Sequence, residues 1–257
     1  MDAIILNDLL PPGLPVWSGV ALFVLSAVTS FISAAFGLGG GIVLLAVMAT
    51  LLPATALVPV HGMVQIGSNA GRAVMMARHV RLRVMLPFLA AMAVGAAIGG
   101  LIAIRLPEWM LELGLGGFIL WSVWSKWVPQ SARRALALGG FVSGFLCMFI
   151  GATGPFIAAL MRALELNRLQ LVGTQAATMT LQHVMKVLVF GLLGFAYAPY
   201  LPLILVMIAS GLIGTAIGRR VLHGMGDARF QTALTWVLTL LALRLLWSAA
   251  TGALSAV

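Results

Sequence analysis

The sequence has few charged residues and almost no cysteine. Of its 257 residues only 8% are Asp, Glu, Lys or Arg, whereas 62% are hydrophobic, and the mean hydropathy is +1.11. Several apolar runs are close to or longer than the roughly 18 residues that mark a helix able to cross a bilayer. The single cysteine, Cys147, excludes an intramolecular disulfide. This composition indicates an all-α polytopic membrane protein.

Acidic residues are the scarcer charged type, and none lies deep in an apolar run. The chain has six Asp and Glu against fifteen Lys and Arg, and Glu112 is close to the outer end of its segment. Because cation carriers and proton pumps usually need a buried carboxylate, the expected substrate is a small anion. The basic residues cluster between apolar runs, so the net charge of +9 reflects membrane topology and not nucleic acid binding.

Motifs of enzymes are missing as well. The sequence contains no HExxH, no GxSxG and no carboxylate pair, which argues against a membrane-embedded enzyme. We therefore expect no catalytic residues, no metal site and no cofactor.

Ten hydrophobic segments can be placed along the chain. They cover residues 16–36, 42–52, 58–77, 84–104, 109–125, 135–150, 156–164, 170–192, 199–217 and 229–249. The second and the seventh would cover only about half to two-thirds of a hydrocarbon core about 30 Å thick. We interpret each as a half-helix that returns to the side of its predecessor, which leaves eight full crossings. If one half-helix is wrongly assigned, the number of crossings is odd.

Two glycine-rich breaks precede the half-helices. The first contains Gly37, Gly39, Gly40 and Gly41, and the second contains Gly151, Thr153, Gly154 and Pro155. Gly costs about 1 kcal/mol relative to Ala inside a helix, and unwound backbone in a membrane must line protein or a cavity. Matching breaks in two halves indicate a transporter's binding site, with Gly40 and Gly154 expected at positive φ. The alternative is that these glycines only allow helices to pack closely.

Polar residues follow one face of two longer segments. The third segment carries His61, Gln65, Asn69 and Arg72, and the eighth carries Gln175, Met179, His183 and Lys186 in equivalent places. Ionisable residues inside a membrane cost of order 3 kcal/mol each and are functional candidates by default. We therefore predict that Arg72 and Lys186 supply countercharge to an anion; the alternative is that each snorkels to its nearer surface. His61 and His183 are either hydrogen-bonded core residues or carriers of a coupling proton.

The two halves share one order of elements in opposite orientations. Residues 37–72 align without gaps with residues 151–186. We predict one transmembrane domain over residues 1–257, built from two inverted repeats of about five helical elements, each with a glycine-broken helix and a half-helix near the midplane. Repeat 1 covers about 16–125, the linker 126–134 and repeat 2 about 135–249. Eleven of the fifteen basic residues then face the cytoplasm, so the positive-inside rule places both termini outside.

Two halves of this size, each with a glycine-rich break shortly after its start, resemble the TauE/SafE sulfite exporter family, also called TSUP transporters. The similarity covers nearly the whole chain, although this second break keeps only Gly151, Gly154 and Pro155 where the family often repeats GGG. The resemblance implies transport of small sulfur-containing anions, such as sulfite, thiosulfate or organosulfonates, across the inner membrane.

We expect a secondary carrier that works by alternating access. The alternatives are a small-anion channel and a transporter of another small oxyanion or carboxylate. The expected partners are the anionic substrate and the lipid bilayer, with a coupling proton or other ion left open. The sequence does not indicate an oligomeric state.

Overall fold

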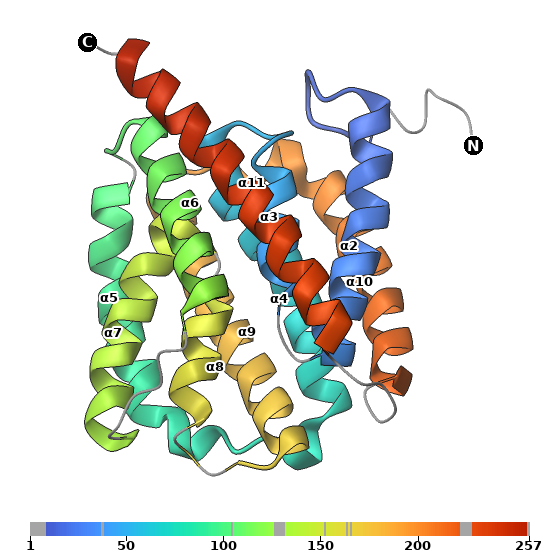
Figure 1. Cartoon of the computed structure of the whole chain (residues 1–257), viewed down its shortest axis with the longest axis vertical. Coiled ribbons are helices and arrows are strands. Elements are labelled where there is room, and N and C mark those ends of the chain that lie inside the picture. The colour runs from blue at the N-terminus through green and yellow to red at the C-terminus, as the bar shows by residue number, and fades with distance from the viewer. Residues whose placement is uncertain are drawn as a thin grey trace.

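The structure is a computed structural model that describes residues 9–36, 39–103, 105–125, 132–151, 153–162, 164, 166–221 and 228–255. Within these ranges the regular elements are all helices, most of which stand side by side while α11 (Ala228–Ser255) runs obliquely across one face (Figure 1). The expected all-α polytopic fold is confirmed.

The helices match the ten predicted segments in order and closely in extent. The first half contains α2 (Val16–Phe36), α3 (Gly40–Met48), α4 (Ala54–Met75), the short 3-10 helices η1 (Ala77–His79) and η2 (Leu82–Met85), α5 (Leu86–Ala103) and α6 (Glu108–Trp124). The second half contains α7 (Ala132–Ile150), α8 (Gly154–Arg162), α9 (Arg168–Leu192), η3 (Ala198–Tyr200), α10 (Leu201–Val221) and α11. The two half-helices, α3 and α8, have 9 residues each, although both begin two residues earlier than predicted.

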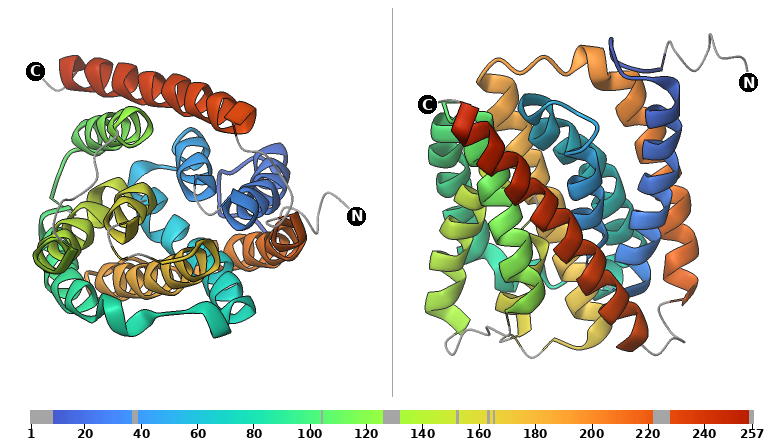
Figure 2. Two further views of the ribbon diagram at one scale, coloured as in Figure 1. Left: turned by 60° about the horizontal axis from the view of Figure 1, so that its bottom comes forward. Right: turned by 45° about the horizontal axis from the view of Figure 1, so that its top comes forward.

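In the described part of the chain, three helical stretches are long and apolar enough to cross a membrane, judged by length and composition alone. These are Val16–Phe36, Leu86–Ala103 and Ala198–Val221. Helices α4 and α9 are also long enough, with 22 and 25 residues, but polar residues lower their hydropathy. The two polar helices pack against each other, and the long helices surround α3 and α8 (Figure 2). The bundle therefore encloses the two half-helices and buries the polar side chains of α4 and α9, such as His61, Gln175 and Lys186.

Each half packs its helices against helices of the other half. Helix α2 packs on α10 and helix α7 packs on α5, so each contact joins one half to the other. Backbones touch at these crossings, because a Cβ on Gly214 would lie 1.9 Å from the carbonyl oxygen of Ala27, and one on Gly95 would lie 2.1 Å from that of Phe141. The pairs α4 with α9 and α6 with α11 also join the halves. A two-fold relation between the halves would give this pattern, and the inverted repeat itself stays a prediction.

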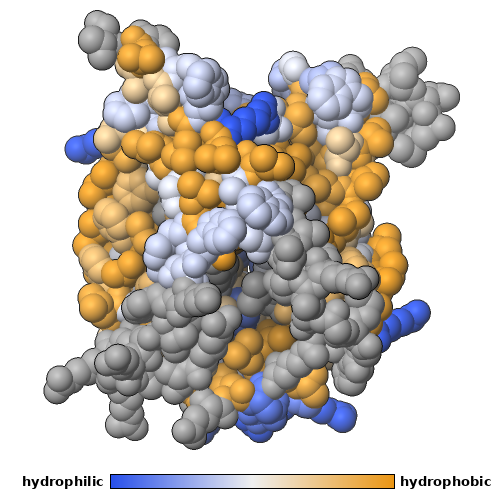
Figure 3. Space-filling model, in the orientation of Figure 1, coloured by the Kyte–Doolittle hydropathy of each residue, from blue (hydrophilic) through white to orange (hydrophobic). Residues whose placement is uncertain are grey.

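The ends of the bundle differ in charge. Helix α2 begins and α11 ends at one end, whereas η1, η2 and the end of α10 lie at the other (Figure 1). This second end carries basic residues, namely Arg78, Arg81, Arg83, Arg219 and Arg220. On the face that Figure 3 shows, apolar side chains line both edges of the bundle between its ends. The arrangement fits the positive-inside prediction, while the direction of insertion remains a prediction.

Candidate functional site

The breaks redirect the chain at one glycine in each half. Gly39 has φ 99° and forms the N-cap of α3, and Gly151 has φ 77° immediately after α7. Gly37 lies outside the described residues. The expectation of positive φ at Gly40 and Gly154 is wrong, because these residues are the first of α3 and α8 and neither has a positive φ. At the first break the residue after the left-handed Gly39 already belongs to α3. At the second break α8 begins three residues after the left-handed Gly151.

The remaining glycines of the breaks serve different steric purposes. A Cβ on Gly40 would lie 1.8 Å from the carbonyl oxygen of Thr29, and one on Gly41 would lie 2.2 Å from Nε2 of Gln65. Close packing therefore accounts for both, as the alternative reading of the sequence proposed. By contrast, the nearest atom to a Cβ on Gly154 would be Cε of Met179 at 3.9 Å, so a side chain has room there.

A continuous line of contacts joins the two breaks through α4 and α9. Nε2 of His61 lies 3.0 Å from the carbonyl oxygen of Gly41. The next residue, Gly62, lies against Lys186, since a Cβ there would be 2.6 Å from Cε of the lysine. Nζ of Lys186 donates a hydrogen bond of 2.8 Å to the carbonyl oxygen of Gly151. These five residues, Gly41, His61, Gly62, Lys186 and Gly151, are called the central line below.

Lys186 is the only charged residue of the central line. Its side chain is 0% exposed, so it does not snorkel to a surface. A lysine ammonium has three donors, and the bond to Gly151 uses one of them. Neither α4 nor α9 contains an Asp or Glu. The structure thus holds a buried cation beside unwound backbone, with no carboxylate on the two polar helices.

Two histidine rings meet beside the central line. The ring centroids of His61 and His183 lie 5.8 Å apart in an edge-to-face arrangement. Both ring nitrogens of His183, Nδ1 of His61 and Oγ1 of Thr178 are buried without a hydrogen-bond partner among the described residues. Nε2 of Gln175 donates to the carbonyl oxygen of Gly154 at 3.2 Å, while its Oε1 is unpaired. Unpaired buried polar atoms are rare in native proteins and point to a ligand or water nearby.

Arg72 and Asn69 form a separate group further along α4. Nη2 of Arg72 donates to Oδ1 of Asn69 at 2.5 Å, and Nδ2 of Asn69 donates to the carbonyl oxygen of Gln65 at 2.9 Å. Arg72 is 7% exposed, and its Nε and Nη1 have no partner among the described residues. At 1.5 Å per residue it lies about 16 Å along α4 from His61. Arg72 is therefore buried, but the described contacts do not bring it to Lys186.

A hydrogen-bonded triangle anchors the second break. Thr153 donates through Oγ1 to Oε1 of Gln182 at 3.0 Å, and Nε2 of Gln182 donates to Oγ of Ser143 at 2.9 Å. The hydroxyls of Ser143 and Thr153 lie 3.0 Å apart. Sequence reasoning missed Ser143. The signal was its position 114 residues after Thr29, the same offset that relates the two breaks.

The sulfite exporter TauE/SafE family model matches residues 22–245. The chain belongs to the TauE/SafE family. The match includes both breaks and both polar helices, so the resemblance seen in the sequence is confirmed. Membership identifies a membrane transporter of sulfur-containing anions and not an enzyme. No curated protein and no solved structure matches the chain.

Proposed function

We propose that this TauE/SafE protein is a secondary carrier that moves a small sulfur oxyanion or an organosulfonate across the inner membrane by alternating access. The observation that supports this most is the Lys186 ammonium, fully buried and bonded to the Gly151 carbonyl. A buried charge without a counterion is costly. A bound anion compensates that charge, which a cationic substrate cannot do.

The half-helices add to the attraction for an anion. The first N–H groups of a helix have no partner within it, and the helix dipole makes that end positive. Helix α3 begins with Gly40 and Gly41, whereas the second residue of α8 is Pro155, which has no N–H. The first half therefore offers one more backbone donor than the second at this position. We propose that Gly40 and Gly41 bind substrate oxygens together with Lys186.

Neutral donors complete the proposed site. Gln175 already contacts the start of α8, and His183 keeps both ring nitrogens unpaired among the described residues. Gln65 lies against Gly41. We assign Thr153 and Gly151 to holding the break in shape, because their polar atoms bond Gln182 and Lys186. We propose that Asn69 and Arg72 form a second binding position for the anion, nearer the basic end of the bundle.

Ligand titration tests the proposal. Purified protein is heated with sulfite, thiosulfate, sulfate, taurine, sulfoacetate or chloride, and we expect a saturable rise in Tm with at least one sulfur-containing anion and a smaller one with chloride. In proteoliposomes, uptake of that anion should saturate and show counterflow. Flux that is linear in concentration without counterflow supports the channel, and no response to any sulfur-containing anion refutes the proposal.

A further inference from the structure

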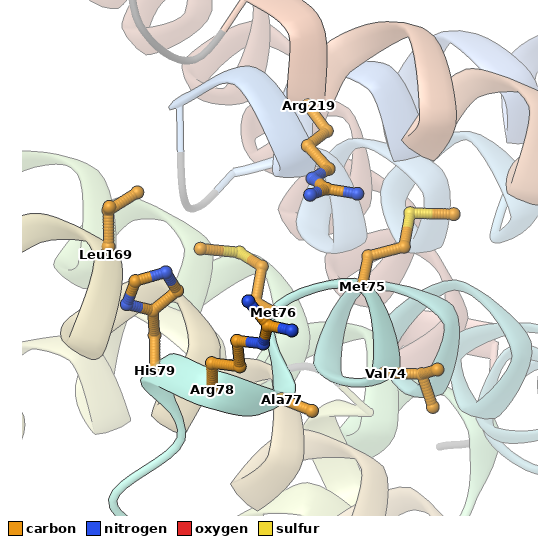
Figure 4. A pocket seen from close by; sticks show the side chains of 8 residues that line it. All are labelled: Val74, Met75, Met76, Ala77, Arg78, His79, Leu169 and Arg219. Carbon is orange, nitrogen blue, oxygen red and sulfur yellow. The ribbon is translucent and has the colours of Figure 1, made fainter.

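A cavity of about 410 Å³ lies at the basic end of the bundle, away from the central line. Its lining comes from the end of α4, η1, the start of α9 and the end of α10. The lining residues are Val74, Met75, Met76, Ala77, Arg78, His79, Leu169 and Arg219 (Figure 4). The proposed transport function uses none of them.

The charged and titratable groups of the described lining are all basic. Arg78, His79 and Arg219 line it, and no Asp or Glu is among the described lining residues. The guanidinium of Arg219 reaches from α10 toward the segment that carries Met75 and Met76 (Figure 4). Methionine, valine and leucine side chains form the rest of the wall. A ligand of this cavity should therefore carry negative charge next to an apolar part.

Contacts with α9 fix the segment that carries Arg78 and His79. Gly173 of α9 faces this segment, and a Cβ there would lie 3.4 Å from Cβ of Met76 and 3.6 Å from Cβ of His79. Two residues after His79, the backbone N–H of Arg81 donates to Oγ1 of Thr174 at 2.9 Å. The wall of the cavity is thus attached to a long helix at both ends of η1.

The surroundings of the cavity indicate a lipid. Val74, which lines it, is 75% exposed, and Ile217, two residues before Arg219, is 51% exposed. Exposed apolar side chains of a membrane helix face acyl chains, whereas arginine at a helix end lies at headgroup level. The cavity therefore opens where a headgroup meets its acyl chains. Its volume is also much larger than a lone tetrahedral oxyanion needs.

We propose that this cavity binds the phosphate headgroup of an anionic phospholipid in the leaflet at the basic end. Basic pockets between transmembrane helices are known to bind such headgroups, and arginine suits phosphate because its planar fork offers paired donors. The bound lipid joins α4 and η1 of the first half to α9 and α10 of the second. This inference does not depend on which anion is transported.

Lipid binding to the purified full chain tests the proposal. Detergent-solubilised protein is titrated with dioleoylphosphatidylglycerol or dioleoylphosphatidylcholine, with retained lipid counted by native mass spectrometry and Tm measured in parallel. We expect one retained phosphatidylglycerol and a higher Tm, with little effect of phosphatidylcholine. Arg78→Gln and Arg219→Gln should each weaken phosphatidylglycerol binding about fivefold.

Arg220→Gln is the matched control, because Arg220 is the neighbour of Arg219 at the end of α10, is also exposed and does not line the cavity. It should keep near-normal lipid binding. An equal loss in Arg220→Gln would mean diffuse attraction to the membrane surface and would overturn the proposal. A second titration uses inorganic phosphate or sulfate in place of lipid. If either ion raises Tm as much as the lipid does, and Arg219→Gln abolishes this rise, the cavity binds a soluble oxyanion and the lipid proposal is wrong. Arg219→Lys, which keeps the charge, separates a folding defect from lost recognition, because Tm without lipid should stay normal while lipid binding falls.

Discussion

Lys186 shows how a single residue can be both structural and functional. Its ammonium holds the Gly151 carbonyl, which a helix break leaves without its usual partner, and two further donors are available to a ligand. Arg72 occupies the equivalent place in the first half, and the residue equivalent to Gly151 is Gly37, outside the described residues. The equivalence supports the proposal that Arg72 also binds the anion, through its Nε and Nη1, which are unpaired among the described residues.

Neutralising Lys186 should weaken anion binding. We expect Lys186→Gln to raise the Kd of the stabilising anion about 10- to 150-fold, which corresponds to the roughly 1.5–3 kcal/mol of a charge-assisted hydrogen bond. Lys186→Arg should not restore binding, because a planar fork does not fit a site shaped for a point charge beside Gly62. The measurement is ligand titration on purified protein, with the exposed Arg244 changed to Gln as control. Equal Kd values for wild type and Lys186→Gln would place the anion elsewhere.

Gln182 should matter for stability and not for recognition. Gln182→Leu removes the amide bonds to the hydroxyls of Thr153 and Ser143, which among the described residues keep only their bond to each other. The expected cost is about 0.5–1.5 kcal/mol for each lost bond. Thr180→Val is the control, since among the described residues the Thr180 hydroxyl bonds the Ala176 carbonyl of its own helix and no other group. We expect a clearly lower Tm for the first variant and a nearly unchanged one for the second. A lower anion affinity at unchanged Tm in Gln182→Leu would contradict this assignment.

At the scale of elements, the two half-helices are short because each begins directly after a break. Among the described residues of the two breaks, Gly39 and Gly151 have the left-handed conformation, whereas Gly40 packs directly against the backbone of α2. The three glycines in a row thus combine a break with close packing, two roles that sequence reasoning treated as alternatives.

Substitutions at the second break can separate conformation from space. Gly151→Ala should destabilise the protein by about 1–2 kcal/mol, because its φ of 77° disfavours any L side chain. Gly154→Ala should leave Tm unchanged or higher, since this residue is helical and nothing is within 3.9 Å of the new Cβ. If the anion lies against α8, Gly154→Leu weakens binding while the protein still folds. Normal binding by Gly154→Leu would remove Gly154 from the site.

Most of the fold could be predicted from the sequence, and the site only in part. Apolar runs and glycine breaks are local patterns, so each described α-helix was expected nearly where it lies, whereas the 3-10 helices η1, η2 and η3 were not expected. The contacts of the central line could not be predicted, because they depend on how α4 and α9 cross. Gly62 carries no polar group that would mark it in the sequence, and the crossing of the two helices brings it to Lys186. Ser143 was missed because a lone serine in an apolar helix has no periodic signal, and only its offset of 114 residues from Thr29 pointed to it.

For the whole molecule, the prediction to test first is orientation. Ala77 in η1 and Ala198 in η3 are both exposed and follow the two long polar helices. The native Cys147 is buried, so it should not react. In intact cells a membrane-impermeant maleimide should label Ala198→Cys at once and Ala77→Cys only after permeabilisation. The reverse result would invert the proposed topology and place both termini in the cytoplasm.

The packing of helices from one half on helices of the other also has a consequence for membrane insertion during translation. Oγ of Ser26 in α2 donates to the carbonyl oxygen of Met207 in α10, yet residues 37–200 must be made before α10 begins. At about 5–20 residues per second the ribosome needs roughly ten to thirty seconds for that stretch. During this delay α2 sits in the bilayer with its serines facing acyl chains or an insertase. A chain that stops after α6 never receives this partner, so the first half made alone should be cleared by membrane proteases.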